Sequence, residues 1–349
     1  MKENPYTLAF GYPPMELIER TAQAERIIDE FCRERPANFI NLVTGIRGSG
    51  KTVFITQIAS RLGEKKNWIV VNLNAQRDLL TSLAAKLDSD RTLHSWFQKA
   101  RINIQAFGLG IDLKGEMQVA DIEEALRRML LSIKTHNKRV LITVDEAVNS
   151  NDMRVFASAY QIFLREQLPV FLLMTGLFRE LDRLKNAPGM TFLERAPRTM
   201  LLPLNNNAIA ENYASNLSLK MDAALRFAAM SKGYSFAFQV LGYFLWENAK
   251  DHNRAISYAR EYLFEFAYQK IWSETSAKDK QVLHAIANVP SGEVLQIRKR
   301  LNYTSNQFNP YRDRLLKSGI VYSPGNGVLL FALPFFDVFT KQALASENK

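Results

Sequence analysis

The stretch "FINLVTGIRGSGKTVFITQIASRLG", residues 39–63, decides the fold of this chain. Its first part is almost continuously apolar, its middle is rich in glycine, and its last part carries apolar residues three and four positions apart. These patterns predict, in order, a strand buried on both faces, a tight turn and an amphipathic helix that stops at Gly63. A strand, a glycine-rich turn and a helix in this order form the context in which proteins bind phosphate groups.

Four further short runs share the apolar, β-branched character of residues 39–45, and helical patterns separate them. Such alternation predicts a parallel sheet with helices on both faces. The expected fold class is therefore α/β: a P-loop NTPase with a parallel five-stranded sheet sandwiched by helices. The remaining four strands are expected at residues 68–74, 139–146, 169–176 and 199–205.

Residues 101–114, "RINIQAFGLGIDLK", interrupt the alternation of strands and helices. Polar and apolar residues alternate about a glycine-containing centre, a pattern that predicts an inserted β-hairpin. The hairpin has two interpretations: an edge that covers the sheet, or a loop that touches a substrate or a neighbouring subunit.

Strand signals stop after residue 205, and helical patterns continue to residue 272. Three further helical segments then precede two short strands around "SPGNG" at 323–327, which is the order of a winged helix. We expect three domains. They are a P-loop domain at 1–205, with the hairpin near 101–114, a helical lid domain at 206–272 and a winged-helix domain at 273–349.

The composition excludes several classes of protein. With 349 residues, 47% hydrophobic and 23% charged, the chain is expected to be globular, and a single cysteine, Cys32, rules out an intrachain disulfide. The longest apolar run, residues 328–336, contains a proline and is far shorter than the roughly 20 residues of a membrane-spanning helix. We therefore expect no membrane partner, and the N-terminus, which lacks the pattern of a signal peptide, favours a cytoplasmic location.

The formal charge of +10 suits a polyanionic partner, although many proteins are basic for solubility alone.

The glycine-rich turn fits the phosphate-loop motif G-x-x-x-x-G-K-[ST] at Gly45, Gly50, Lys51 and Thr52. Its glycines let backbone N–H groups point at phosphate oxygens, and the following helix adds its positive end. Lys51 is expected on the β and γ phosphates, and the Thr52 hydroxyl on Mg²⁺. The predicted nucleotide-binding residues are Gly45, Ile46, Arg47, Gly48, Ser49, Gly50, Lys51, Thr52 and Val53, of which Arg47 has no separate role.

A second part of the site is expected in "VLITVDEA", residues 140–147, where a buried strand ends in two carboxylates. Asp145 is the candidate metal ligand, and Glu146 the candidate base that deprotonates the attacking water. In an open sheet the ligand lies at the carboxyl ends of the strands, so the hydroxyl of Thr175 is expected to reach the γ phosphate or the water. Its other interpretation is a simple turn residue.

Arg195 and Arg198 precede the last predicted strand. Either one is a candidate arginine finger that projects toward the nucleotide of a neighbouring subunit, which would require a homo-oligomer. The alternative is that both are ordinary surface arginines.

Together these residues resemble an ATPase of the AAA+ class, similar to the origin-recognition-complex-like initiator ATPases and to the archaeal-type signal-transduction ATPases with numerous domains, the STAND group. The resemblance is carried by "GIRGSGKT", "ITVDEA", "LLMTG", "RTMLLPLN" and "GYSFAFQVLGY", and more loosely by the lead-in "PMELIERTAQAERIIDEF". It implies an ATP-dependent switch with Mg²⁺, in which the nucleotide lies at the joint between sheet domain and lid and a winged helix follows.

Two positions depart from these families. The lid segment "GYSFAFQ" holds no arginine where initiator ATPases have a second sensor, and Ser235 stands where STAND proteins have a proline. We therefore expect an ATPase that turns over slowly.

The segment "SNQFNPYRDRLLKSG", residues 305–319, takes the place of a recognition helix, with Ser305 as its expected cap. Amides and arginines read base edges in a major groove, and basic side chains meet phosphates. Residues 293–341 contain seven Lys and Arg against three Asp and Glu, a balance that favours nucleic acid. The predicted contacts to duplex DNA are Asn306, Gln307, Asn309, Tyr311, Arg312 and Arg314, supported by Lys299 and Arg300.

Two hypotheses of different classes follow. The first is a DNA-binding ATPase regulated by ATP and ADP. The second is a STAND-type module that hydrolyses ATP slowly, binds no DNA and presents its winged helix to a protein partner. A third is a degenerate loop that binds no nucleotide.

Overall fold

The computed structural model describes residues 3–9, 14–102 and 119–347. These residues form two compact units, each described separately below. The sheet unit comprises Thr21–Thr44 and Lys51–Leu201, and the helical unit comprises Met1–Arg20, Gly45–Gly50 and Leu202–Lys349. The hairpin expected at residues 101–114 lies almost entirely outside the described residues.

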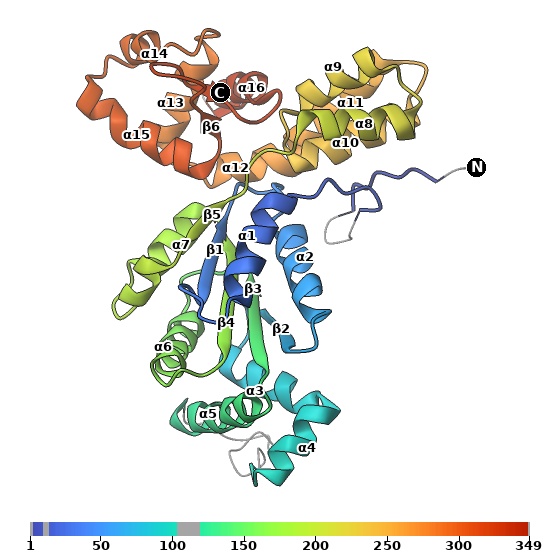
Figure 1. The fold of residues 1–349 in the computed structure, drawn as a ribbon. Helices are drawn as coiled ribbons and strands as arrows, with labels where there is room; N and C mark the ends of the chain where they lie inside the picture. The colour runs from blue at the N-terminus through green and yellow to red at the C-terminus, as the bar shows by residue number, and fades with distance from the viewer. Residues whose placement is uncertain (1–2, 10–13, 103–118, 348–349) are drawn as a thin grey trace. The chain divides into compact units, whose positions relative to one another are not determined.

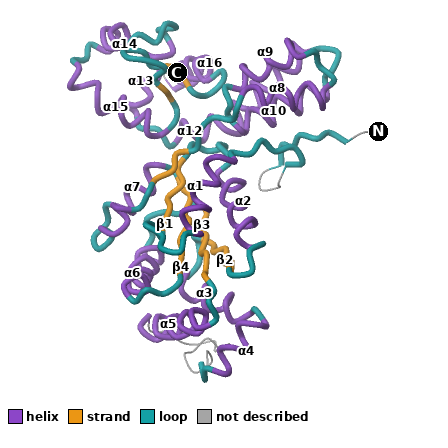
Figure 2. Tube along the Cα trace, viewed as in Figure 1, coloured by secondary structure: helices purple, strands orange, loops and turns teal. Residues whose placement is uncertain are grey.

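The sheet unit is built on one parallel five-stranded sheet with the order β2-β3-β4-β1-β5 (Figures 1 and 2). This architecture confirms the predicted α/β class and P-loop NTPase fold. Each interior strand is buried because helices cover both faces, and all seven residues of β4 are buried. The strands are β1 (Ile40–Thr44), β2 (Trp68–Asn74), β3 (Arg139–Asp145), β4 (Val170–Gly176) and β5 (Arg198–Met200).

Successive strand residues enter two different cores, as the period of a strand requires. Leu42 belongs to one apolar cluster and its neighbour Val43 to the other. The second cluster is formed with helices α1 (Thr21–Cys32) and α2 (Lys51–Gly63). The first is formed with α3 (Leu79–Ser89), α4 (Arg91–Lys99), α5 (Val119–Thr135), α6 (Asn151–Arg165) and α7 (Phe178–Lys185).

The last strand is shorter than the expected 199–205, and this expectation is corrected. Arg198, Thr199 and Met200 pair with β1, and the Leu201 N–H still donates to the Thr44 carbonyl at 2.9 Å. Pro203 has no N–H to donate to a further ladder bond. Pairing therefore ends there, and from Leu202 the chain belongs to the helical unit.

The helical unit has one continuous apolar core that extends from Tyr6 and Leu204 to Phe339. Tyr6 packs against Gly242, where a Cβ atom would lie 2.5 Å from its ring. The division of this unit at residue 272 stays a prediction. Its elements are α8 (Asn206–Leu217), α9 (Met221–Ser231), α10 (Ser235–Glu247), α11 (His252–Leu263), the π-helical turn η3 (Phe264–Tyr268), α12 (Gln269–Ser273), α13 (Ala277–Ala287), α14 (Val294–Leu301), α15 (Ser305–Ser318), β6 (Val321–Tyr322), β7 (Leu330–Phe331) and α16 (Phe336–Glu347).

The N-cap residue of helix α15 lies one position earlier than expected. Thr304, not Ser305, is the N-cap residue, and it forms a capping box with Gln307. The reason is conformational, because Thr304 has the extended backbone that a cap requires whereas Ser305 is already helical. Within the described ranges, no helix is long and apolar enough to cross a membrane.

Candidate nucleotide site

The loop between β1 and α2 needs glycine at two of its positions. Gly48 and Gly50 have φ angles of 72° and 85°, in the left-handed region that side chains disfavour. At Gly48 a Cβ atom would lie 2.3 Å from the hydroxyl of Tyr234, and at Gly50 one would lie 3.3 Å from the Oγ of Ser235. Both the backbone and its neighbours therefore exclude larger residues at Gly48.

Three consecutive carbonyls of the loop accept hydrogen bonds from the beginning of α10. The Tyr234 hydroxyl donates to the Arg47 carbonyl at 2.7 Å, and the Ser235 hydroxyl donates to the Ser49 carbonyl at 3.0 Å. The backbone N–H of Phe236 donates to the Gly48 carbonyl at 3.0 Å. Because the N–H and C=O of a planar trans peptide point in opposite directions, the amides that follow these carbonyls, those of Gly48, Ser49 and Gly50, point away from α10. The Ser49 N–H also donates to the Ile46 carbonyl at 3.2 Å. Amides arranged in this way form a nest for an anion.

Ser49 provides an independent test of whether the loop suits a phosphate ligand. Its side chain is buried, and its Oγ has no hydrogen-bond partner among the described residues. A buried hydroxyl without a partner costs about 1 to 3 kcal/mol. A phosphate oxygen bound in the loop fits this position, because it would accept the missing hydrogen bond.

In the sheet unit, helix α2 begins at Lys51 directly after the loop. The Lys51 side chain is buried, and the Thr52 hydroxyl donates to Oδ2 of Asp145 at 2.6 Å. A hydroxyl and a carboxylate oxygen are the kind of ligands that Mg²⁺ takes beside phosphate and water. No group of three or more His, Cys, Asp or Glu that could hold a metal is found in residues 3–9, 14–102 and 119–347. The Thr52 hydroxyl and the Asp145 carboxylate fit a Mg²⁺ ion whose other ligands would come from phosphate and water.

The carboxyl ends of β3 and β4 bring three predicted residues together. The buried hydroxyl of Thr175 donates to Oδ1 of Asp145, and the backbone N–H of Glu146 donates to the Thr175 hydroxyl at 3.2 Å. The same N–H donates to Oδ1 of Asp145 at 3.0 Å. Thr175 thus holds Asp145 and the backbone of Glu146; its contact with a phosphate or water stays a prediction.

Glu146 has a left-handed backbone, with a φ of 54°, and an exposed side chain. This conformation costs a non-glycine residue about 1 to 3 kcal/mol, and such strain is concentrated at functional sites. The hydrogen bonds of its N–H hold it in place.

The two candidate finger arginines have different surroundings. Arg195 ends the short 3-10 helix Thr191–Arg195 and is exposed. The guanidinium of Arg198 lies 4.4 Å from the centre of the Phe178 ring and forms an ion pair with Asp182 at 3.5 Å. Arg198 is therefore held by helix α7 of its own unit, whereas Arg195 has the exposure that a finger requires.

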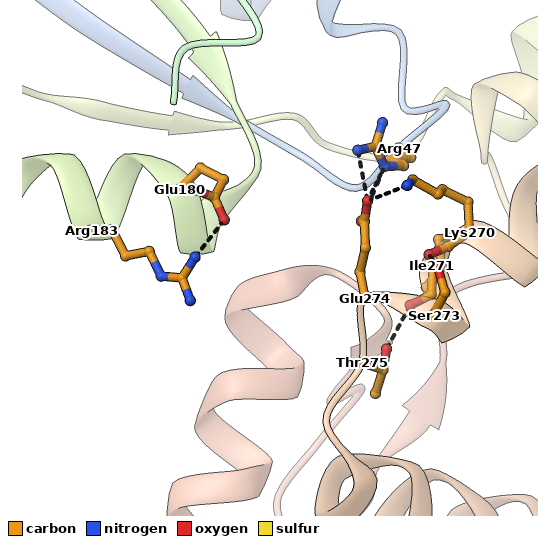
Figure 3. Close-up of polar contacts among 8 residues, drawn as sticks. All are labelled: Arg47, Glu180, Arg183, Lys270, Ile271, Ser273, Glu274 and Thr275. Atoms are coloured by element: carbon orange, nitrogen blue, oxygen red, sulfur yellow. Dashed lines mark hydrogen bonds and ion pairs between the residues drawn. The ribbon is translucent and has the colours of Figure 1, made fainter. Parts of the chain in front are cut away.

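Two arginines that the sequence left without a role contact the loop region within the helical unit. Arg20 donates to the Ser235 hydroxyl at 3.0 Å and to the Leu202 carbonyl at 2.6 Å, and burial lowers its pKa to about 10. Arg47 forms an ion pair with Glu274 at 2.8 Å (Figure 3). The sequence offered little to predict these contacts: Arg20 lies in the lead-in segment and Arg47 in the variable part of the loop.

Helix α15 presents some of its predicted DNA contacts and uses others internally. Asn306, Gln307 and Asn309 are exposed, although the side-chain Oε1 of Gln307 also accepts a hydrogen bond from the Thr304 N–H in the capping box. Arg314 forms an ion pair with the buried Asp279 at 2.6 Å. Its side-chain hydrogen bond to Asp279 raises the pKa of Arg314.

The aromatic part of α15 is also packed internally, since the Tyr311 ring stacks on Tyr303 with centroids 5.8 Å apart. Arg312 is half-buried, and Lys299 and Arg300 are exposed.

Parts of the chain match known protein families. Residues 22–163 match the family model of the ATPase domain predominantly from Archaea, and residues 265–340 match a domain of unknown function, DUF8462. No curated protein matches the chain.

Solved structures share the fold at low sequence identity. The Walker-type ATPase of Pyrococcus abyssi is 14% identical, with a TM-score of 0.63 over 93% of this chain and 96% of that chain. The ORC2 protein of Aeropyrum pernix, in ADPNP–ADP complexes, is also 14% identical, with a TM-score of 0.59 over 97% of this chain and 98% of that chain. Residues 22–163 thus resemble an ATPase domain found mainly in Archaea, and the chain shares the fold of these two solved structures.

Proposed function

We propose that this protein binds ATP with Mg²⁺, hydrolyses it slowly, and couples its nucleotide state to duplex DNA through a C-terminal winged helix. One observation carries the nucleotide part. The hydroxyls of Tyr234 and Ser235 and the N–H of Phe236 hold the loop carbonyls, so the amides of a glycine-rich loop point to one side. We place the protein in the cytoplasm.

In the proposed reaction each residue has one task. The loop amides and Lys51 bind the phosphates, and the positive end of α2 adds to their attraction. Thr52 and Asp145 would hold Mg²⁺, which would supply positive charge to the phosphates. The Glu146 carboxylate orients the attacking water and accepts its proton as the water oxygen bonds to the γ phosphorus, while the bond from that phosphorus to the oxygen of the departing ADP breaks. Thr175 positions Asp145 through its hydroxyl.

Slow hydrolysis is expected for a single copy of the chain. The beginning of α10, Tyr234–Phe236, contributes no arginine, and Arg198 is engaged with Asp182 and Phe178. An exposed Arg195 from a neighbouring copy would supply charge to the transition state, where an arginine finger contributes a factor of about 10³ to 10⁵. We therefore propose that turnover rises in a homo-oligomer.

The proposed DNA contact lies on α15 and α14. Helices α13, α14 and α15 are followed by the antiparallel pair β6–β7, the order of a winged helix. The exposed amides of Asn306 and Asn309 are available to base edges, and the exposed Lys299 and Arg300 to phosphates. Arg314 serves the packing of α15 on α13 in this proposal.

The test is ATP hydrolysis with and without duplex DNA, on wild type and Glu146→Gln. We expect slow turnover that DNA alters, and a loss of about 10²-fold or more in the variant with nucleotide binding retained. Lys51→Ala should lose nucleotide binding itself. Wild type that binds no ATP would refute the nucleotide part.

DNA binding has its own test. Affinity should fall steeply with salt, and Lys299→Ala should reduce the slope of log K against log [salt] by about 1, whereas Arg254→Ala on α11 should leave it unchanged. Affinity that does not depend on salt would contradict the proposal.

A second candidate is the STAND-type module with a protein partner. It is favoured by the internal engagement of three predicted DNA contacts: Gln307 in a capping box, Tyr311 on Tyr303 and Arg314 with Asp279. Its signature would be slow hydrolysis that DNA does not change, with no salt-dependent DNA binding.

A further inference from the structure

Arg47, in the variable part of the phosphate loop, has a specific partner far along the chain. Its Nη2 donates to Oε1 of Glu274 at 2.8 Å and its Nε to Oε2 at 3.1 Å, so the guanidinium and carboxylate meet through two parallel hydrogen bonds (Figure 3). Lys270 lies 3.5 Å from the same carboxylate. Two-point pairing of this kind is stronger and geometrically more specific than a single contact.

Glu274 is ionised at neutral pH. Partial burial raises the pKa of Glu274, but the hydrogen bond and charge of Arg47, together with Lys270, lower it by more. The pKa of Glu274 therefore lies below its usual range. The carboxylate therefore carries a full charge while it holds Arg47.

Glu274 lies in the short segment between helices α12 and α13. It follows α12 directly and precedes Ser276, which caps α13. Helix α13 is the first helix of the proposed winged helix. The loop is therefore held from two places: its main chain by the beginning of α10 and its Arg47 side chain by the end of α12.

We propose that Glu274 is a positioning residue that acts through Arg47, shapes the phosphate loop for nucleotide, and transmits nucleotide binding to the segment that leads into α13. This inference rests on the proposed function, because it concerns regulation of the same site. Coupling between two sites is reciprocal, so a contact that shapes the loop for nucleotide must also be stabilised by nucleotide.

The direction in which Glu274→Gln changes nucleotide affinity separates this positioning role from simple electrostatic repulsion. A carboxylate near the phosphate loop repels phosphate, so Coulomb's law alone predicts that Glu274→Gln tightens nucleotide binding. Positioning predicts weaker binding, because the loop would lose the partner that orders Arg47.

The first measurement is the Kd of a fluorescent ADP analogue with Mg²⁺. Glu274→Gln and Arg47→Gln should each raise the Kd about fivefold, a change of about 1 kcal/mol for a partly exposed pair. The double variant should be no worse than either single variant, and the exchanged pair Arg47→Glu with Glu274→Arg should recover part of the affinity. Glu347→Gln, which removes a different ion pair in the same unit, should bind as wild type.

The second measurement is amide hydrogen exchange of the full chain with and without the same analogue. Nucleotide should slow exchange in residues 264–287 of wild type and of Glu347→Gln, and this protection should be lost in Glu274→Gln. A merely structural role would lower Tm without removing the nucleotide-dependent difference.

The outcomes separate the two proposals. If wild type binds no nucleotide, both the proposed function and this inference fail. If wild type binds but Glu274→Gln binds equally or more tightly, or keeps the protection of residues 264–287, only this inference is overturned. Additive losses in the double variant would likewise refute coupling between Arg47 and Glu274.

Discussion

At Gly48 the chain has no room for even one methyl group. The left-handed backbone and the nearby Tyr234 hydroxyl both oppose a Cβ atom. We predict that Gly48→Ala abolishes binding of a fluorescent ADP analogue and lowers stability by about 1 to 2 kcal/mol. The matched control is Gly325→Ala, because nothing lies within 4 Å of its Cβ position. Normal nucleotide binding by Gly48→Ala would contradict the proposed loop geometry.

Two buried threonines at strand ends, Thr175 and Thr44, allow the role of a single hydroxyl to be tested. The Thr175 hydroxyl bonds to Asp145, whereas the Thr44 hydroxyl has no hydrogen-bond partner among the described residues. Thr175→Val should therefore cost about 1 to 3 kcal/mol of unfolding free energy and lower kcat by about tenfold. Thr44→Val should be nearly neutral in stability. Urea unfolding and ATP turnover check both, and equal effects would argue against a positioning role for Thr175.

At the scale of an element, helix α13 introduces a dependence on pH. Burial lowers the pKa of His284, and the charges of Arg300 and Lys341 lower it further. Between the folded and the unfolded pKa, the unfolded chain binds a proton that the folded helix does not. The free energy of unfolding should therefore show no loss from His284 above about pH 6.5 and should fall as the pH drops below that value.

The measurement is the Tm of the full chain from pH 7.5 to 5.5. Wild type should lose about 1 to 2 °C more than His284→Gln over this range. A pH profile that His284→Gln does not change would show that another group is responsible.

At the scale of the whole molecule, the proposed finger Arg195 is expected to act between copies of the chain. Lys51→Ala should lose nucleotide binding but keep Arg195, and Arg195→Ala should bind nucleotide but lose the finger. If Arg195 acts on a neighbour, mixing the two inactive variants should restore hydrolysis to a measurable fraction of wild type. Arg198→Ala should instead keep hydrolysis by itself, because Arg198 contacts Asp182 and Phe178 of its own chain and Arg195 is still present. A mixture that stays inactive would exclude a finger supplied in trans.

Much of the sheet unit could be read from local pattern. Residues 40–44, 68–74, 139–145 and 170–176 are strands within one residue of expectation, because a strand covered on both faces is apolar along its whole length. The pattern failed at the last strand, where Leu201, Leu202 and Leu204 continue the apolar run but pairing ends. An apolar run indicates that residues are buried, but it does not indicate whether they are buried in the sheet or in the helical unit.

The sequence by itself determined the α/β fold, the phosphate-loop motif and the acidic strand end at Asp145, because each is a short pattern whose spacing carries the chemistry. Only the tertiary structure decided what holds that loop. Arg47 and Glu274 are 227 residues apart, and Tyr234 is 187 residues from the carbonyl that it binds. An ion pair or hydrogen bond across such a separation depends on how helices pack around a shared core, and no local periodicity records that packing.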